Sequence, residues 1–217
     1  MPCLILPKSR FLHIPKTGGK WVQQALQAGG MEFEKWPVAH CGLAEAPEPD
    51  LFTFAFVRNP LTWLQSIWRY RMARDWPRGG QAFRIAAPGK DIEPLFSDSF
   101  AEFVKNFLDE CPGYCSWLFE RFVGTRGAPI DYIGKQETLA ADLVGALEAA
   151  GEEFNRDRLI MFPPYHMTDK TWNADYTPEL AAAVIMAERE AIGRFGYGED
   201  CEREMVRLEC CQLDRRE

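Results

Sequence analysis

Two lysines and two adjacent glycines near the start of the chain stand where an apolar run gives way to a helical pattern. The stretch FLHIPKTGGKWVQQAL, residues 11–26, contains Lys16, Gly18, Gly19 and Lys20. Residues 10–15 are typical of a short buried strand and residues 18–28 of a helix. Glycine lets backbone N–H groups at the amino end of a helix come close to an anion, and lysine adds a full positive charge. This pattern predicts a phosphate-binding loop.

The stretch differs from the sequence pattern of P-loop kinases. That pattern, G-x-x-x-x-G-K-[ST], places a magnesium-binding hydroxyl directly after its lysine. Here Gly19 and Lys20 are followed by Trp21, and the first glycine of the pattern is missing. A site without that hydroxyl is less suited to magnesium-dependent nucleotide chemistry. An ordinary turn between a strand and a helix, with glycines for close packing, is the alternative interpretation.

A second group of polar residues follows the strongest strand signal in the chain. Residues 51–57, LFTFAFV, form a continuous apolar run, which is typical of a strand covered on both faces. Asn59 and Pro60 then suit the N-cap and the first position of a helix. Arg58 ends the strand, and Ser66 lies eight residues later on the helix. Because an arginine fork and a hydroxyl can hold a phosphate together, these two residues form a second candidate anion site.

The helix that begins at Pro60 is predicted to have an apolar and a polar face. The apolar face consists of Leu61, Leu64, Trp68 and Met72. Ser66 shares the opposite face with Thr62 and Arg69. A capped, solvent-facing start of a helix with a surface arginine is the alternative to a phosphate site.

Strands alternate with helices along the rest of the chain. Helices are expected over residues 99–109, 114–123 and 138–150, a strand over 130–134, and a long helix from Thr177 to Phe195 that ends at Gly196. We therefore expect an α/β fold with a mostly parallel sheet flanked by helices, in which ligands bind at the carboxyl ends of the strands. Both candidate anion sites fall at that edge. One domain is expected over residues 1–198, and a charged tail that forms a short helix or frays over 199–217.

Two anion sites at neighbouring strand ends suit a ligand with two separated phosphates, and both motifs resemble those of the sulfotransferases that use 3′-phosphoadenosine 5′-phosphosulfate (PAPS). HIPKTGGKW, residues 13–21, is similar to the family's 5′-phosphosulfate loop and has the HIPKTGG start of the carbohydrate branch. FVRNPLTWLQSIWRY, residues 56–70, resembles the 3′-phosphate motif, with Arg58 and Ser66 at the family's spacing. YIGKQETLAADL, residues 132–143, and residues 176–200 are similar to later segments of the family.

The resemblance implies a single-domain, P-loop-like fold and a role for each matching residue. Lys16 would contact the bridging and sulfuryl oxygens and stabilise the charge on the departing phosphate. The 5′-phosphate would be surrounded by Thr17, Gly18, Gly19, Lys20 and Trp21, and the 3′-phosphate held by Arg58 and Ser66. Lys20 departs from the family, which usually has Ser or Thr there, so charge is added and a compact hydroxyl is lost. No metal is implied.

Transfer to a hydroxyl also requires a group that takes the acceptor's proton, and a histidine that titrates near neutrality suits this role. The three histidines are His13 in the first strand, His40 in a loop and His166 in a late loop. His13 is expected to pack in the core. In the carbohydrate branch, a histidine in a segment comparable to that of His40 is catalytic. The resemblance therefore favours His40 as the base, with an ordinary loop residue as the alternative.

Composition limits the other classes of function. Lys and Arg number 25 and Asp and Glu number 32, and the net charge of −7 argues against a general nucleic-acid binder. The chain has no Cys-x-x-Cys pair, so its cysteines are expected to be reduced thiols in a cytoplasmic protein, without a metal site. They are Cys3, Cys41, Cys111, Cys115, Cys201, Cys210 and Cys211. No apolar run reaches the roughly 20 residues of a membrane span, and the first residues do not form a signal peptide.

One basic segment stands out against the acidic composition. Residues 69–90 contain six Lys and Arg residues and one acid, Asp75, with Trp76 and Phe83 among them. A solvated loop is the expected structure. A lid over the nucleotide or over an acidic acceptor is the alternative.

Together these motifs predict a sulfotransferase that moves the sulfuryl group of PAPS to a hydroxyl or amine of a small-molecule or glycan acceptor. Lys16 and His40 are the expected catalytic residues. A P-loop nucleotide-dependent kinase and a non-catalytic nucleotide-binding protein are the two alternatives. The sequence predicts neither the acceptor nor the oligomeric state.

Overall fold

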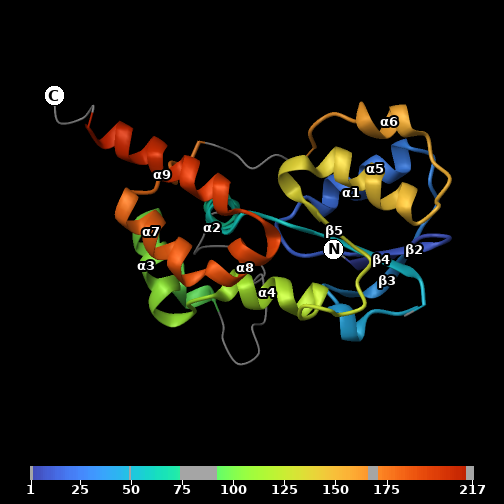
Figure 1. The fold of residues 1–217 in the computed structure, drawn as a ribbon, viewed down its shortest axis with the longest axis horizontal. Coiled ribbons are helices and arrows are strands. Elements are labelled where there is room, and N and C mark those ends of the chain that lie inside the picture. Colours follow the sequence, from blue (N-terminus) through green and yellow to red (C-terminus); the bar gives the residue numbers. More distant parts are fainter. Residues whose placement is uncertain (1, 49, 74–91, 166–170, 214–217) are drawn as a thin grey trace. The chain divides into compact units, whose positions relative to one another are not determined.

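The apolar run that precedes Arg58 forms β4 (Phe52–Val57), an interior strand of a five-stranded sheet. The computed structural model describes residues 2–48, 50–73, 92–165 and 171–213. Its fold is α/β, with one sheet flanked by helices (Figure 1). The side chains from Thr53 to Val57 are all buried, as expected for a strand that is covered on both faces.

The chain divides into two compact units. The sheet unit comprises Met1–Arg58 and Leu118–Met167, and the helical unit comprises Asn59–Trp117 and Thr168–Glu217. One boundary falls directly after Arg58 and another inside α4 (Tyr114–Val123). The domain expected over residues 1–198 therefore spans both units.

Four strands of the sheet run in one direction. The order is β3 (Glu34–Ala39), β1 (Pro2–Ile5), β2 (Ser9–Leu12), β4 and β5 (Tyr132–Lys135). β2, β4 and β5 pair in parallel, while β1 is antiparallel to both β2 and β3, so β3 runs in the same direction as β2. The mostly parallel sheet is thus confirmed, with β1 as the reversed strand. As a result, the carboxyl ends of β3, β2, β4 and β5 meet at one edge.

Two helices cover one face of the sheet and build the main core of the sheet unit. These are α1 (Gly19–Ala28) and α5 (Leu139–Ala149), and α6 (Arg156–Ile160) lies beside them (Figure 1). Apolar residues at helical spacing in α1 point inward, namely Val22, Ala25 and Leu26. They pack with Phe11, Phe54 and Phe56 from the strands and with Leu143 and Leu147 from α5.

Buried polar side chains fix the connections of the sheet unit. Arg10 is 3% exposed and donates to the Thr53 hydroxyl at 2.7 Å and to the carbonyl of Pro47 at 2.6 Å. Glu152 accepts from the Ser9 hydroxyl at 2.7 Å. The Arg10 contacts hold the segment after β3, which includes the short 3₁₀ helix η1 (Leu43–Glu45), against the sheet.

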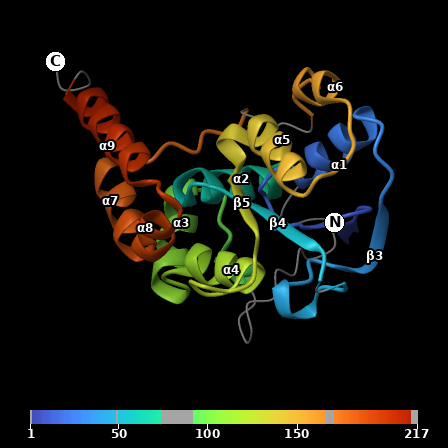
Figure 2. The ribbon, with the colours of Figure 1, turned by 45° about the vertical axis from the view of Figure 1, so that its right-hand side comes forward.

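The helical unit is built around α2 (Pro60–Met72). As predicted, Pro60 is its first residue, and the side chain of Asn59 accepts from Leu61 N. The other elements are η2 (Glu93–Leu95), α3 (Phe100–Glu110), α7 (Pro178–Ala187), α8 (Arg189–Phe195) and α9 (Gly198–Leu213), which Figure 2 shows from a second side. Aromatic rings dominate this core: Trp63 packs on Phe107 and Tyr114.

The alternative of a solvent-facing start of α2 does not fit the structure, because its polar face is largely enclosed. Ser66 is only 3% exposed, and Trp63 and Ile67 are buried as well, because α2 is enclosed around most of its circumference. Two further polar side chains of α2 bind a neighbouring segment of the same unit. Gln65 donates to Ala174 O and Arg69 donates to Trp172 O, both at 2.9 Å.

Other boundaries differ from the predicted elements for identifiable reasons. The single helix expected from Thr177 is interrupted at Glu188, whose buried carboxylate accepts from Cys115 N and from Ser116 at the start of α4. Gly196 ends α8 in the left-handed conformation, as predicted. β1, β3 and α6 were not predicted, and η3 (Gln136–Thr138) precedes α5. The charged tail is helical through most of its length as α9.

Gly134 in β5 offers a test of this packing. A Cβ at this position would lie 2.7 Å from both Phe56 Cδ1 and Asp142 Cβ, so Gly134→Ala should lower the free energy of unfolding by roughly 1–3 kcal/mol. Gly193 in α8 has open space around its Cα, and Gly193→Ala should raise stability by up to about 1 kcal/mol. Urea unfolding of both variants checks the pair. Equal stability of Gly134→Ala and the parent would contradict the assigned approach of β4, β5 and α5.

Candidate functional site

The loop over residues 13–18 joins β2 to α1 through two left-handed residues. Lys16 has a φ of 67° and Gly18 a φ of 87°. This conformation is costly for lysine, because its Cβ crowds the following carbonyl oxygen. Residues held in this way cluster at ligand sites. The strained lysine thus lies at the position where the sequence predicted an anion.

Side-chain contacts close this loop on itself. The Thr17 hydroxyl, fully buried, donates to Ile14 O at 2.8 Å. A Cβ on Gly18 would press on Leu139, and a Cβ on Gly19 would overlap the imidazole of His13. The two glycines are therefore required by close packing. The hydroxyl of Thr17 serves the loop, so its predicted phosphate contact is left to the backbone N–H.

The amino end of α1 suits an anion. Its N-cap is Gly18, which has no side chain that could cap the helix. The described first turn, Gly19 to Trp21, contains no acidic residue. The first N–H groups of a helix have no intrahelical partner and carry a partial positive charge. Lys20 adds an exposed ammonium-bearing side chain in the same turn. Lys16 therefore lies two residues before Gly18, the N-cap of α1.

Arg58 reaches the same loop from the neighbouring strand. Its Nη1 donates to the carbonyl oxygen of Lys16 at 3.1 Å. β2 and β4 are parallel, with Leu12 opposite Ala55, so both chains leave the sheet at the same edge. The structure thus brings Lys16 and Arg58 together, as the strand order predicted for their elements.

Trp21 lies in the core rather than at the surface of the loop. It is 8% exposed, its ring meets that of Phe162 edge-on at 5.9 Å, and its Nε1 donates to Pro163 O at 3.0 Å. Trp21 therefore anchors the segment after α6 to the first turn of α1. A contact between the 5′-phosphate and the backbone of Trp21 in α1 stays a prediction, while the indole is occupied by these contacts.

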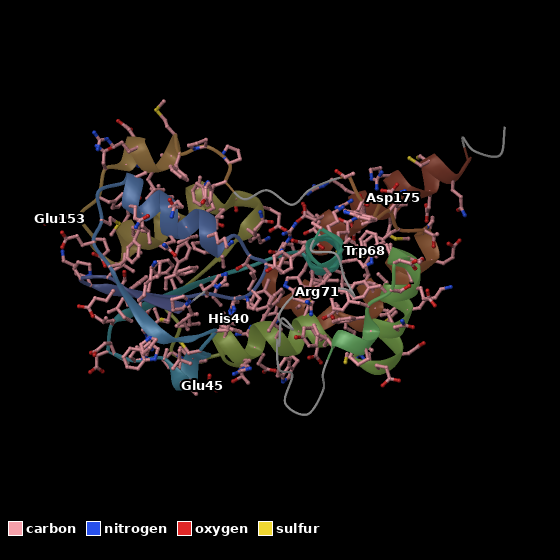
Figure 3. All side chains as sticks on the ribbon, turned by 180° about the vertical axis from the view of Figure 1, so that it is seen from behind. His40, Glu45, Trp68, Arg71, Glu153 and Asp175 are labelled. Carbon is pink, nitrogen blue, oxygen red and sulfur yellow. The ribbon has the colours of Figure 1, made fainter. Side chains whose placement is uncertain are left out.

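His13 and His40 form a pair at this edge of the sheet. β2 ends at Leu12, so His13 lies in the loop and not, as predicted, within the strand. His40 directly follows β3, and its φ of 57° is also left-handed. The two ring centroids are 5.2 Å apart, and His40 Nδ1 lies 3.4 Å from His13 O. Figure 3 labels His40 at this turn, together with Glu45 on η1.

The contact between the two histidines fits one tautomer of His40. A carbonyl oxygen can only accept, so Nδ1 of His40 carries the proton in this contact and Nε2 is its basic nitrogen. Burial lowers the pKa of His40 from 6.5 to about 4, with smaller contributions from nearby positive charge that includes Arg121. His40 is therefore a neutral imidazole at pH 7, able to accept a proton.

The other predicted site residues belong to the helical unit or fall outside the described residues. Ser66 is a buried residue of α2, in the helical unit, whereas Lys16, Arg58, His13 and His40 belong to the sheet unit. His166 and most of the basic segment over 69–90 lie outside the described residues. Within that segment, Arg71 is buried over the ring of Phe96, at 5.1 Å, so this basic residue serves packing.

His13 is buried, at 8% exposure, which agrees with its predicted place in the core. It also belongs to this edge of the sheet, because its ring rests on Gly19 and its carbonyl oxygen contacts His40 Nδ1. The signal that points to this role is its place directly after the last strand residue, inside the HIPKTGG motif. A residue one step beyond a strand belongs to the edge where ligands bind.

Over the described ranges, no three side chains among His, Cys, Asp and Glu come together in a way that could hold a metal ion. None of the helices in those ranges has both the length and the apolar composition of a membrane-crossing segment. Comparison of the chain with protein-family models, with curated proteins and with solved structures found no match. Function is therefore inferred from the residues and their geometry.

The low pKa of His40 predicts how stability depends on pH. Between pH 6.5 and about 4, the unfolded chain binds a proton at His40 that the folded protein does not, so stability falls as the pH is lowered through this window. His40→Asn removes this loss and keeps a residue that tolerates positive φ. Across this pH window, the free energy of unfolding of the parent should fall by about 2 kcal/mol more than that of the variant. This is less than the whole pKa shift would give, because the ring is partly exposed to solvent.

Urea unfolding from pH 8 to pH 4 checks this dependence. Glu48→Asn is the matched control, because Glu48 also has a positive φ, 53°, and is exposed. If the free energies of unfolding of the parent and His40→Asn differ by the same amount at every pH, the lowered pKa of His40 is contradicted.

Proposed function

We propose that this protein is a PAPS-dependent sulfotransferase with a P-loop-like fold, which transfers a sulfuryl group to a hydroxyl or amine of a small-molecule or glycan acceptor. The observation that carries this proposal is the hydrogen bond from Arg58 to Lys16 O. It joins the guanidinium that follows β4 to the backbone of the lysine loop that follows β2, directly before the amino end of α1. Such an arrangement suits a ligand with several phosphate oxygens.

The loop chemistry favours a sulfuryl donor over a magnesium-bound triphosphate. The Walker position after Lys20 is held by Trp21, whose indole contacts Pro163 and Phe162. The nearest hydroxyl in the loop, on Thr17, already donates to Ile14 O. The loop also contains positive charges and backbone N–H donors, which can stabilise a departing phosphate electrostatically.

The proposed reaction is an in-line displacement at sulfur. The acceptor oxygen forms a bond to sulfur while the bond from sulfur to the bridging oxygen of the 5′-phosphate breaks. Lys16 stabilises the charge that develops on the departing phosphate. Nε2 of His40 takes the acceptor's proton, since Nδ1 is directed to His13 O. The negative charge of the bound donor raises the pKa of a nearby imidazole, which strengthens His40 as a base.

Binding of adenosine 3′,5′-bisphosphate tests the nucleotide site. Calorimetry should show tighter binding of the bisphosphate than of ATP with Mg²⁺. Lys16→Gln and Arg58→Gln should each weaken bisphosphate binding by about 10- to 100-fold, because each removes a charge-assisted contact. Lys105→Gln, at an exposed position of α3, is the control and should change the Kd less than about twofold. If ATP with Mg²⁺ binds more tightly than the bisphosphate, the proposal is contradicted and a P-loop kinase is favoured.

His40→Asn tests the catalytic base. With labelled PAPS and an acceptor found by screening alcohols, amines and glycans, turnover should fall about 100-fold, while the Kd for the bisphosphate stays within about twofold. Glu48→Asn again serves as the control. Unchanged turnover would exclude His40 as the base. Bisphosphate binding without transfer to any acceptor would identify a non-catalytic nucleotide-binding protein.

A further inference from the structure

The pairing of β1 with β3 brings two cysteines together beside His40. Pro2 of β1 lies opposite Ala39 of β3, and the register shifts between Pro2 and Leu4, so Cys3 occupies an irregular position in the ladder. Cys41 follows Ala39 by two residues. The two side chains are hydrogen-bonded to each other, and each is 1% exposed. Contact between the two side chains is the first requirement for a disulfide.

The hydrogen bond polarises the pair. It raises the pKa of the Cys3 thiol well above its usual range and lowers the pKa of Cys41 from 9.0 to about 7. Cys3 is thus the donor, and the hydrogen bond favours the thiolate form of Cys41. The thiolate is the nucleophilic form of cysteine, so Cys41 is the reactive member.

The buried cysteines of the helical unit have the opposite character. Burial raises the pKa of Cys115 well above its usual range and also raises that of Cys201. Cys115 is 0% exposed and Cys201 is 3% exposed. These thiols are expected to remain protonated and inert. They provide internal controls for the reactivity of Cys41.

We propose that Cys3 and Cys41 are a modification site at which a peroxide forms a reversible disulfide. The Cys41 thiolate attacks one oxygen of hydrogen peroxide, the O–O bond breaks, and the hydroxide that leaves is protonated to water. The Cys3 sulfur then attacks the Cys41 sulfenic acid, and the sulfenic oxygen leaves as a second water with the proton of Cys3. Two thiols are oxidised and one peroxide is reduced. A buried pair admits a molecule as small as peroxide in preference to a bulky disulfide.

The disulfide would act on the candidate base, a consequence that rests on the proposed function. Cys41 directly follows His40, which is held at a φ of 57° and contacts His13 O. Drawing the Cys41 sulfur toward β1 shifts the backbone that carries the imidazole. Oxidation should therefore lower turnover while leaving Lys16 and Arg58, on other strands, in place to bind nucleotide.

Peptide mapping tests the disulfide directly. Trypsin cleaves after Lys8, Lys35 and Arg58, so Cys3 and Cys41 fall in separate peptides that contain no other cysteine. The full chain with Cys210→Ser and Cys211→Ser, which removes the two exposed thiols, is treated with hydrogen peroxide, alkylated and digested without reductant. A linked peptide should form at a peroxide dose that leaves Cys115 alkylatable, and dithiothreitol should remove it.

The possible outcomes test the disulfide independently of the proposed enzymatic function. Cys3→Ser and Cys41→Ser should each abolish the linked peptide, and the parent result does not depend on how these variants fold. Oxidation of Cys41 to sulfinic acid without the link, a cross-link between two chains, or full alkylation of both cysteines at that dose would overturn the proposal. A link that forms in a protein without sulfuryl transfer would contradict the proposed function while upholding the disulfide.

Discussion

The hydrogen bond from the Arg58 guanidinium to the carbonyl of Lys16 joins the ends of two parallel strands. It exists because β2 and β4 leave the sheet at the same edge, so the residues that follow them are neighbours although 42 positions separate them. A cation held at this point faces a loop whose backbone already turns through a left-handed lysine. The charge, the loop and the amino end of α1 all act on one small region.

The direction of β3 extends this edge to a histidine. β3 pairs only through β1, and two antiparallel pairings return it to the direction of β2. His40, at the carboxyl end of β3, therefore meets His13 at the carboxyl end of β2. Lys16 and His40 are two of three residues other than glycine with positive φ in the described ranges. Both lie at this edge, which is where strained backbone is expected in a functional site.

The same strand pairing creates the thiol pair. Cys3 and Cys41 meet because β1 is the reversed strand between β3 and β2, so its start lies beside the end of β3. Their shared hydrogen bond places a thiol of lowered pKa next to the candidate base. A sheet edge that gathers strand ends thus collects reactive side chains of more than one kind, which is why chemistry concentrates there.

Much of the fold could be predicted because its signals are local. The continuous apolar run of β4, the Asn59–Pro60 start of α2 and the Gly196 end of α8 are read by rules that involve neighbouring residues. β1 and β3 gave no such signal, since β1 is four residues long and the edge strand β3 is exposed and contains Pro37. The break at Glu188 depends on a carboxylate that caps another helix, a contact that no local pattern contains.

The candidate site divides in the same way. The sequence by itself determined the residue types and the loop: Lys16, the two glycines and Arg58 stand at strand ends, where a period of apolar residues stops. Only the tertiary structure decided that Ser66 is enclosed in α2, that Trp21 belongs to the core, and that His13 and Cys41 flank His40. The physical reason is that these properties follow from strand pairing and burial, which join residues far apart in the chain, whereas helix and strand signals come from neighbours.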